Sequence, residues 1–164
     1  MKKTIVIVGG GFAGLEFIRK IGNSEKYNTI LVDANNYNFF PPLIYQVSTG
    51  LMEPSAISYP FRKILRHNKN TRFRLGSLEK VIPNENKIVL SNGELNYDIL
   101  VMATGTESNY FGNKNIEAYS LPMKTISDAL TLRNTILTRL DRATRLTSEI
   151  ERQKMLTFVI AGAG

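Results

Sequence analysis

Residues 4–14 read TIVIVGGGFAG, and this stretch decides the fold of the 164-residue chain. The β-branched run Thr4–Val8 is typical of a strand that is buried on both faces of a parallel sheet. A glycine-rich turn follows, and Phe12–Ile21 then has the pattern of a helix. A second apolar run occupies Asn28–Val32. Strand, helix and strand within about thirty residues predict a βαβ unit of the α/β class.

The turn carries the spacing G-x-G-x-x-G at Gly9, Gly11 and Gly14. In this motif the first glycine allows a tight turn, the second lets a pyrophosphate approach, and the third lets helix and strand pack closely. The N-terminus of the following helix offers N–H groups to the phosphates. Asp33 lies nineteen residues beyond Gly14, where an acidic side chain binds a ribose diol and repels a 2′-phosphate. The pattern predicts a site for FAD or NAD rather than NADP.

The middle of the chain predicts more sheet. The segment Asn35–Pro54 reads as a long irregular connection, and loops of this length are usually functional. We expect a short helix over Tyr59–Arg66. The predicted architecture is α/β, a Rossmann-like parallel sheet with an inserted antiparallel β-meander. Its further strands are Arg72–Leu75, Ser77–Ile82, Lys87–Leu90 and Asp98–Ala103, with a turn at Asn92-Gly93.

The C-terminal third predicts one long helix, Ser127–Ile150, preceded by a capping box at Thr125 and Asp128. Its apolar stripe favours core packing, although its arginines leave a membrane-surface helix as an alternative. The stripe consists of Ala129, Leu132, Ile136, Leu140, Ala143, Leu146 and Ile150. Residues 156–164, LTFVIAGAG, resemble the opening motif. We expect a second buried strand and glycine turn there, in a chain that is truncated.

The composition of the chain excludes or disfavours several kinds of site and partner. The chain contains no cysteine, which excludes disulfides, thiolate metal sites and cysteine nucleophiles within it. The single histidine, His67, lies in a basic stretch without obvious ligand partners, and we expect it to be solvated. The net charge of +7 is dispersed, so a solvated basic face is favoured over a membrane surface, and no nucleic-acid partner is expected. No apolar run approaches the ~20 residues of a membrane span, and the N-terminus reads as a strand, which favours the cytoplasm.

Two segments carry a family resemblance. Ala103-Thr104-Gly105, at the end of an apolar strand, resembles the turn near the pyrophosphate in the two-dinucleotide flavoprotein superfamily. The segment Phe39–Gly50, FFPPLIYQVSTG, continues to Tyr59–Arg62 and resembles type II NADH dehydrogenases, in which such a stretch lies against the flavin. Asn38 and Ala34 depart from that family, which often has histidine and a basic residue there.

The resemblance implies a flavin reduced by NADH and reoxidised by a membrane quinone, in a protein peripheral to the inner face of the membrane. Relatives that use cysteines beside the flavin, the thiol–disulfide reductases and sulfide:quinone oxidoreductases, are disfavoured. No residue reads as a general acid or base, so we predict no catalytic residue. The predicted cofactor-binding residues are Gly9, Gly11, Phe12, Ala13, Gly14, Asp33, Ala34, Pro42, Leu43, Ala103, Thr104 and Gly105.

The same resemblance implies a division of the chain. Residues 1–112 are expected to form the FAD-binding domain, residues 113–154 a connecting segment with the long helix, and residues 155–164 the start of an NAD(P)H-binding domain. Most of the NADH site would then lie outside the chain, which alone is expected to be inactive. Apolar surface left by a missing domain favours self-association. The alternatives are a nucleotide-binding module without redox activity and a flavin oxidoreductase with another non-thiol acceptor.

Overall fold

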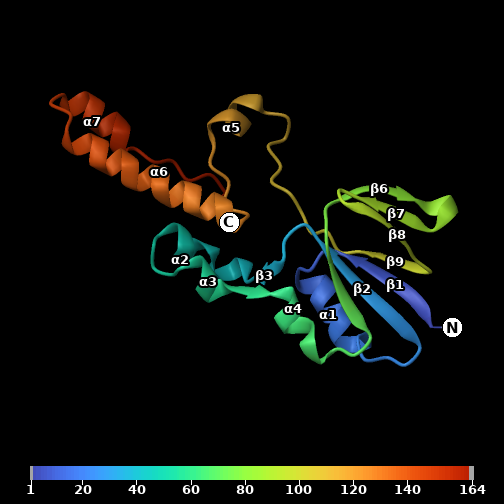
Figure 1. Cartoon of the computed structure of the whole chain (residues 1–164). Coiled ribbons are helices and arrows are strands. Elements are labelled where there is room, and N and C mark those ends of the chain that lie inside the picture. Colours follow the sequence, from blue (N-terminus) through green and yellow to red (C-terminus); the bar gives the residue numbers. More distant parts are fainter. Residues whose placement is uncertain (1, 163–164) are drawn as a thin grey trace. The chain divides into compact units, whose positions relative to one another are not determined.

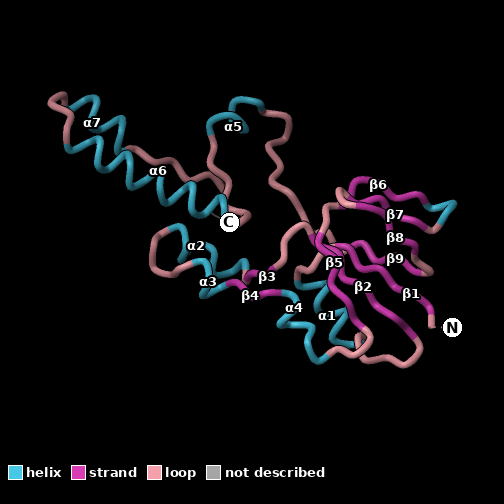
Figure 2. Tube along the Cα trace, in the orientation of Figure 1, coloured by secondary structure: helices cyan, strands magenta, loops and turns pink. Residues whose placement is uncertain are grey.

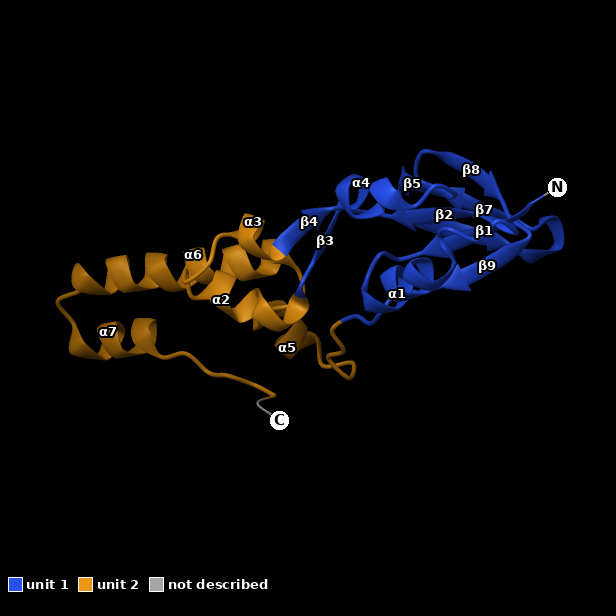
Figure 3. Ribbon diagram, turned by 90° about the horizontal axis from the view of Figure 1, so that it is seen from below, with its two compact units in different colours: residues 1–40, 58–107 blue, residues 41–57, 108–164 orange. Residues whose placement is uncertain are grey.

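The computed structural model describes residues 2–162, which form two compact units (Figure 3). Unit 1 consists of residues 1–40 and 58–107, and unit 2 of residues 41–57 and 108–164. Both units are discontinuous in sequence.

Unit 1 is built on a four-stranded sheet (Figure 2). Its strands are β1 (Lys3–Val8), β2 (Tyr27–Asp33), β5 (Thr71–Leu75) and β9 (Ile99–Met102). They lie in the order β5-β2-β1-β9, and every neighbouring pair is parallel. The predicted parallel sheet is therefore confirmed, and β1 is one of its two central strands.

Strand β1 is buried on both faces because layers cover both sides of the sheet. Ile5 and Ile7 point to the side of helix α1 (Phe12–Ile21), where they join a core with Ile18. Val6 and Val8 point to the opposite side, where they pack with residues of β7. Successive side chains of a strand alternate between faces, so a strand between two layers has no polar face. Figure 1 shows α1 and the β6–β8 layer on opposite sides of the sheet.

The second layer is the predicted antiparallel meander. It consists of β6 (Leu78–Ile82), β7 (Lys87–Leu90) and β8 (Gly93–Asn96), and β7 pairs with both others. The 3₁₀ turn η3 (Pro83–Glu85) joins the first two strands. Lys87 Nζ lies 2.8 Å from Glu85 and 3.2 Å from Glu94. These hydrogen bonds raise the pKa of Lys87 above its ordinary value.

The expected helix over Tyr59–Arg66 is wrong in its first residues. Strand β4 (Ser58–Pro60) pairs antiparallel with β3 (Tyr37–Phe39), and only then does α4 (Phe61–Ile64) begin, followed by the 3₁₀ turn η2 (Leu65–His67). A residue that precedes proline is disfavoured in the helical region, which keeps Tyr59 extended.

Unit 2 is helical over its described residues. Its elements are η1 (Pro41–Leu43), α2 (Ile44–Ser48), α3 (Pro54–Ile57), α5 (Lys114–Tyr119), α6 (Ile126–Thr144) and α7 (Glu149–Leu156). The expectation of an irregular connection over Asn35–Pro54 is therefore wrong. Ile44, Val47 and Ser48 are buried at the spacing of one helical face, and α2 packs against α6. That tertiary contact stabilises a helix too short to persist alone.

The single helix expected over Ser127–Ile150 is two helices. Its predicted capping box is present, because Thr125 accepts from the Asp128 N–H and Asp128 accepts from the Thr125 N–H. The helix nevertheless ends at Thr144, and Ser148 caps a new helix by accepting from the Glu151 N–H. The stripe is only partly buried: Ala129 and Ala143 are buried, whereas Leu140 and Ile150 are exposed.

The buried strand expected from Leu156 onward is also wrong. Leu156 ends α7, and residues 157–162 have no regular secondary structure. Val159 and Ile160 are 88% and 85% exposed. A parallel strand needs a neighbour for its backbone hydrogen bonds, and the described part of unit 2 contains no strand that offers one. Ala163 and Gly164, the end of the expected glycine turn, lie outside the described residues.

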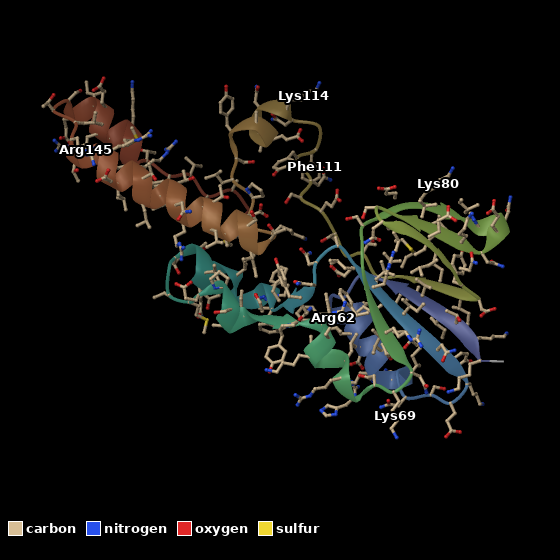
Figure 4. The ribbon with its side chains drawn as sticks, viewed as in Figure 1. Arg62, Lys69, Lys80, Phe111, Lys114 and Arg145 are labelled. Carbon is tan, nitrogen blue, oxygen red and sulfur yellow. The ribbon has the colours of Figure 1, made fainter. Side chains whose placement is uncertain are left out.

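Basic side chains are dispersed over both units. Arg62, Lys69 and Lys80 in unit 1 and Lys114 and Arg145 in unit 2 are all exposed (Figure 4). This distribution is that of solvated charges rather than of one concentrated surface. Between residues 2 and 162, none of the helices combines the length and apolarity that crossing a membrane requires.

The capping box of α6 is open to a direct test. We expect Thr125→Ala to lower the free energy of unfolding of the helix by about 1 kcal/mol, because the Asp128 N–H loses its acceptor. Amide hydrogen exchange in the first turn of α6 measures the effect. The control is Thr131→Ala on the same helix, an exposed position where alanine has the higher helix propensity. Equal exchange in both variants would contradict the importance of the cap.

Candidate nucleotide-binding site

The glycine turn begins where β1 ends. Gly9 has φ +103°, in the region that favours glycine, and its N–H donates to the Val32 carbonyl oxygen at 2.8 Å. A β-carbon on Gly9 would collide with the carbonyl oxygen of Ala103. The absence of a side chain at this position therefore brings the carboxyl ends of β1, β2 and β9 together.

The other two motif glycines have different surroundings. A β-carbon on Gly14 would collide with the Gly9 carbonyl oxygen, so Gly14 allows α1 to pack directly on the turn. Gly11 has no atom within 4 Å of its β-carbon position, so its outer side is open. These environments match the close-packing and open-approach roles that the motif predicts.

Helix α1 presents its N-terminus at this open side. Gly11 is the N-cap, no side chain caps the helix within the described part of the chain, and its first turn carries no acidic residue. The first intrahelical hydrogen bond runs from the Leu15 N–H to the Gly11 carbonyl oxygen, at 3.0 Å. The N–H groups of Phe12, Ala13 and Gly14 precede it at the positive end of the helix dipole. Such an arrangement suits an anionic ligand.

Asp33 lies beside the turn at the end of β2. Its Oδ2 accepts from the Gly10 N–H at 2.7 Å, and its Oδ1 accepts from the Asn35 N–H at 2.8 Å. A carboxylate has about four lone-pair sites, so two remain for donors such as the hydroxyl groups of a ribose. Asp33 is half-buried and the adjoining Ala34 is exposed.

The turn after β9 completes this edge of the sheet. The Ala103 N–H donates to the Val8 carbonyl oxygen at 2.7 Å, which continues the pairing of β9 with β1. Thr104 and Gly105 are exposed, and Gly105 has φ +75°. Ten of the twelve predicted residues thus belong to unit 1. Pro42 and Leu43 belong to η1 of unit 2, and their place at the cofactor remains a prediction.

Two residues at the turn were not predicted as site residues. Gly10 is buried, and a β-carbon there would collide with the ring of Phe61. Asn38 donates from Nδ2 to the Gly10 carbonyl oxygen at 2.9 Å. The run of three glycines signals that position 10 also excludes a side chain. Nothing in the local sequence signals the contact of Asn38, which depends on the β3–β4 pairing.

Aromatic side chains flank the site in unit 1. The rings of Phe12 and Phe40 meet edge to face with 5.8 Å between their centroids. Both are large exposed apolar side chains, at 59% and 46% exposure. Such a pair forms an apolar border beside a polar turn, and apolar walls with a few placed polar groups are typical of cofactor sites.

Other parts of the described structure have fewer features of a cofactor-binding site. Two open grooves, of about 610 and 430 Å³, lie on α6 and α7 and contain none of the predicted cofactor residues. Across residues 2–162, no three metal-binding side chains gather at one place. His67 is exposed, as predicted, and its Nε2 accepts from Arg66 Nε at 2.9 Å.

The geometry fits part of a dinucleotide. The open Gly11 position and the α1 N-terminus suit a pyrophosphate, and the free lone pairs of Asp33 suit a ribose diol. The twofold contact of this carboxylate with backbone N–H groups holds it at the turn. The residues in unit 1 therefore fit the ADP half of FAD or NAD.

Comparison with known proteins gives the same class. The chain is 36% identical over 164 residues to the type II NADH:quinone oxidoreductase NdhA of Mycobacterium tuberculosis, covering 98% of this chain and 35% of that protein. It is 32% identical to the external alternative NAD(P)H-ubiquinone oxidoreductase B2 of Arabidopsis thaliana mitochondria, covering 99% of this chain and 30% of that protein. The chain thus spans about a third of the length of these curated relatives.

Solved structures share the fold. NDH2 of Plasmodium falciparum in complex with NADH superposes with a TM-score of 0.82 at 25% identity, over 94% of this chain and 32% of that one. The sulfide:quinone oxidoreductase of Aquifex aeolicus has a TM-score of 0.76 at 25% identity, over 85% of this chain and 32% of that one. The family model described as pyridine nucleotide-disulphide oxidoreductase matches residues 3–164. Since that match covers nearly the whole sequence, the chain belongs to the pyridine nucleotide-disulphide oxidoreductase family.

Proposed function

We propose that this chain forms the FAD-binding part of an NADH:quinone oxidoreductase. The observation that carries the proposal is the open glycine turn at the N-terminus of α1 with the Asp33 carboxylate beside it. Relatives from a bacterium and a plant mitochondrion that match nearly the whole chain are quinone oxidoreductases by name. Fold likeness alone does not establish a function, so the proposal rests on the site together with these relatives.

The residues of unit 1 bind and orient the cofactor. The N–H groups of Phe12, Ala13 and Gly14 donate to the pyrophosphate, and Asp33 accepts from the ribose hydroxyl groups. Gly9 and the turn Ala103–Gly105 provide the close backbone approach. Pro42 and Leu43 contribute apolar contacts nearer to the flavin.

FAD, when bound, supplies two-electron redox chemistry, taking a hydride from NADH and returning two electrons to an acceptor. The chain contains no cysteine, so its own residues offer no thiol through which those electrons would pass. A quinone is the acceptor that the names of the relatives support. The protein's contribution here is to position the cofactor, and we assign no residue of this chain as a general acid or base.

The proposal includes a place at the membrane. The protein is proposed to be peripheral to the membrane, where it reaches a lipid-soluble quinone. Because it oxidises NADH of the cytoplasm, it binds to the inner face of that membrane. The contacts with NADH, with the quinone and with lipid belong in this proposal largely to sequence beyond the 164 residues.

Binding of FAD is the first test. We expect saturable quenching of flavin fluorescence by the 164-residue chain. Asp33→Asn should weaken binding by about tenfold or more, because an amide replaces one accepting oxygen by a donor and loses the charge that attracts the donors. The matched control is Glu79→Gln, an exposed position on β6 that removes the same charge outside the site. Equal losses in the two variants would contradict the role of Asp33.

Discrimination against a 2′-phosphate tests the same carboxylate. We expect ADP to compete with FAD, and 2′-phosphorylated ADP to compete at least about tenfold less well, because Asp33 repels the phosphate. The difference should shrink in Asp33→Asn. Equal competition by both nucleotides in the unmodified chain would show that this edge of the sheet does not bind a ribose as proposed.

The reaction is tested in the complete gene product that contains this chain. We expect a yellow protein that oxidises NADH when a quinone is supplied, with one quinol formed per NADH consumed. Absorbance at the NADH and quinone bands measures both. A purified, folded product without flavin, or one that reduces only disulfides, would refute the proposal.

A further inference from the structure

Gly10 is held at both of its peptide groups. Its N–H donates to Asp33 Oδ2 at 2.7 Å, and its carbonyl oxygen accepts from Asn38 Nδ2 at 2.9 Å. A carbonyl can only accept a hydrogen bond, so the amide nitrogen of Asn38 must face it. Two side chains from different strands, β2 and β3, thus fix one glycine.

These contacts determine where the next N–H points. A trans peptide group is planar, and its C=O and N–H point in opposite directions. The carbonyl of Gly10 and the N–H of Gly11 belong to one such group, and the described chain contains no cis peptide bond. Since Asn38 holds the carbonyl on one side, the Gly11 N–H points to the other side. It makes no hydrogen bond to any residue in the described part of the chain.

The sequence makes this constraint necessary. Three consecutive glycines, 9 to 11, have wide backbone freedom, and fixing a glycine costs more conformational entropy than fixing any other residue. Without external contacts, the peptide between Gly10 and Gly11 can rotate and turn its N–H away from a ligand. A donor that is already oriented lowers the entropy that binding must otherwise supply.

We propose that Asn38 is a positioning residue for the diphosphate of the bound dinucleotide: by holding the Gly10 carbonyl, it orients the Gly11 N–H toward the phosphate oxygens. The inference rests on the proposed function and adds a residue to its site. It assigns Asn38 no direct contact with the cofactor.

Three further contacts place Asn38 where it can do this. Strand β3 pairs with β4, with Asn38 opposite Tyr59. The Phe61 N–H donates to the Asn36 carbonyl oxygen at 3.0 Å, which anchors the start of the same segment. The Phe61 ring lies against Gly10 itself. The β3–β4 pair and α4 therefore support one position, and Asn38 is half-buried within it.

The test compares three ligands in the 164-residue chain. We expect Asn38→Leu, which keeps the approximate size but removes the donor, to weaken FAD and ADP binding by about tenfold. Adenosine has no phosphate and should bind more weakly than ADP. The variant and the unmodified chain should bind adenosine with affinities within about twofold of each other. The control is Asn36→Leu, an exposed neighbour whose side chain makes no hydrogen bond among the described residues. It should leave all three affinities unchanged.

The other outcomes of this test would contradict either the role of Asn38 or the proposed function. An equal loss for all three ligands, or no loss for any, would overturn the role of Asn38 without contradicting the proposed binding of FAD by the unmodified chain. If the unmodified chain binds neither FAD nor ADP, the proposed function fails and this inference fails with it. If leucine prevents folding, Asn38→Asp keeps the size and sets a carboxylate against the carbonyl. Asn38→Asp should weaken ADP binding by about tenfold, and unchanged ADP affinity would overturn the proposal.

Discussion

The structure of unit 1 depends on a backbone turn in which three glycines have no room for a side chain. A β-carbon on Gly9 would collide with the carbonyl of Ala103, one on Gly10 with the ring of Phe61, and one on Gly14 with the carbonyl of Gly9. Because these contacts are backbone to backbone or backbone to ring, β1, β9 and α1 approach more closely than side chains would permit. The same close approach leaves the N-terminus of α1 open to a ligand.

The remaining layers support this turn. Alternate residues of β1 reach two cores, one with α1 and Phe61 and one with the meander. Asp33 has a double role, since it accepts from the Gly10 N–H and still offers lone pairs to a ligand. Stability and binding therefore rest on the same few groups, and a substitution at Asp33 or Gly9 affects both.

Local sequence patterns correctly predicted those features that depend on interactions between residues close in the sequence. The bounds of α1 agree with the prediction, and the cap at Thr125 is present, because helix signals of this kind act within one turn. The parallel sheet was also predictable, since a β-branched apolar run such as β1 is typical of a strand buried on both faces. Ten of the twelve predicted site residues lie in unit 1, where Gly9 lies against the Ala103 carbonyl and Asp33 accepts from the Gly10 N–H, and their contact with a cofactor stays a prediction.

The predictions that were wrong or incomplete share a different cause. They concern segments whose structure depends on contacts with residues distant in the sequence. Residues 157–160 have strand-like composition, yet the described part of their unit offers no strand to pair with. Helix α2 forms in a segment that reads as irregular, because α6 covers its apolar face. Asn38 was missed as a site residue because its contact with Gly10 joins positions 28 residues apart. No local pattern encodes such contacts.

The turn at residues 9–14, together with Asp33, is proposed to bind the ADP half of FAD. Amide chemical shifts of the isotopically labelled chain, recorded during titration with FAD, test it residue by residue. We expect the largest changes at Gly11, Phe12, Ala13 and Gly14 and at the neighbours of Asp33, whereas the amides of α6 and α7 should stay nearly constant. Changes concentrated on the α6–α7 grooves, with the glycine turn unaffected, would contradict it.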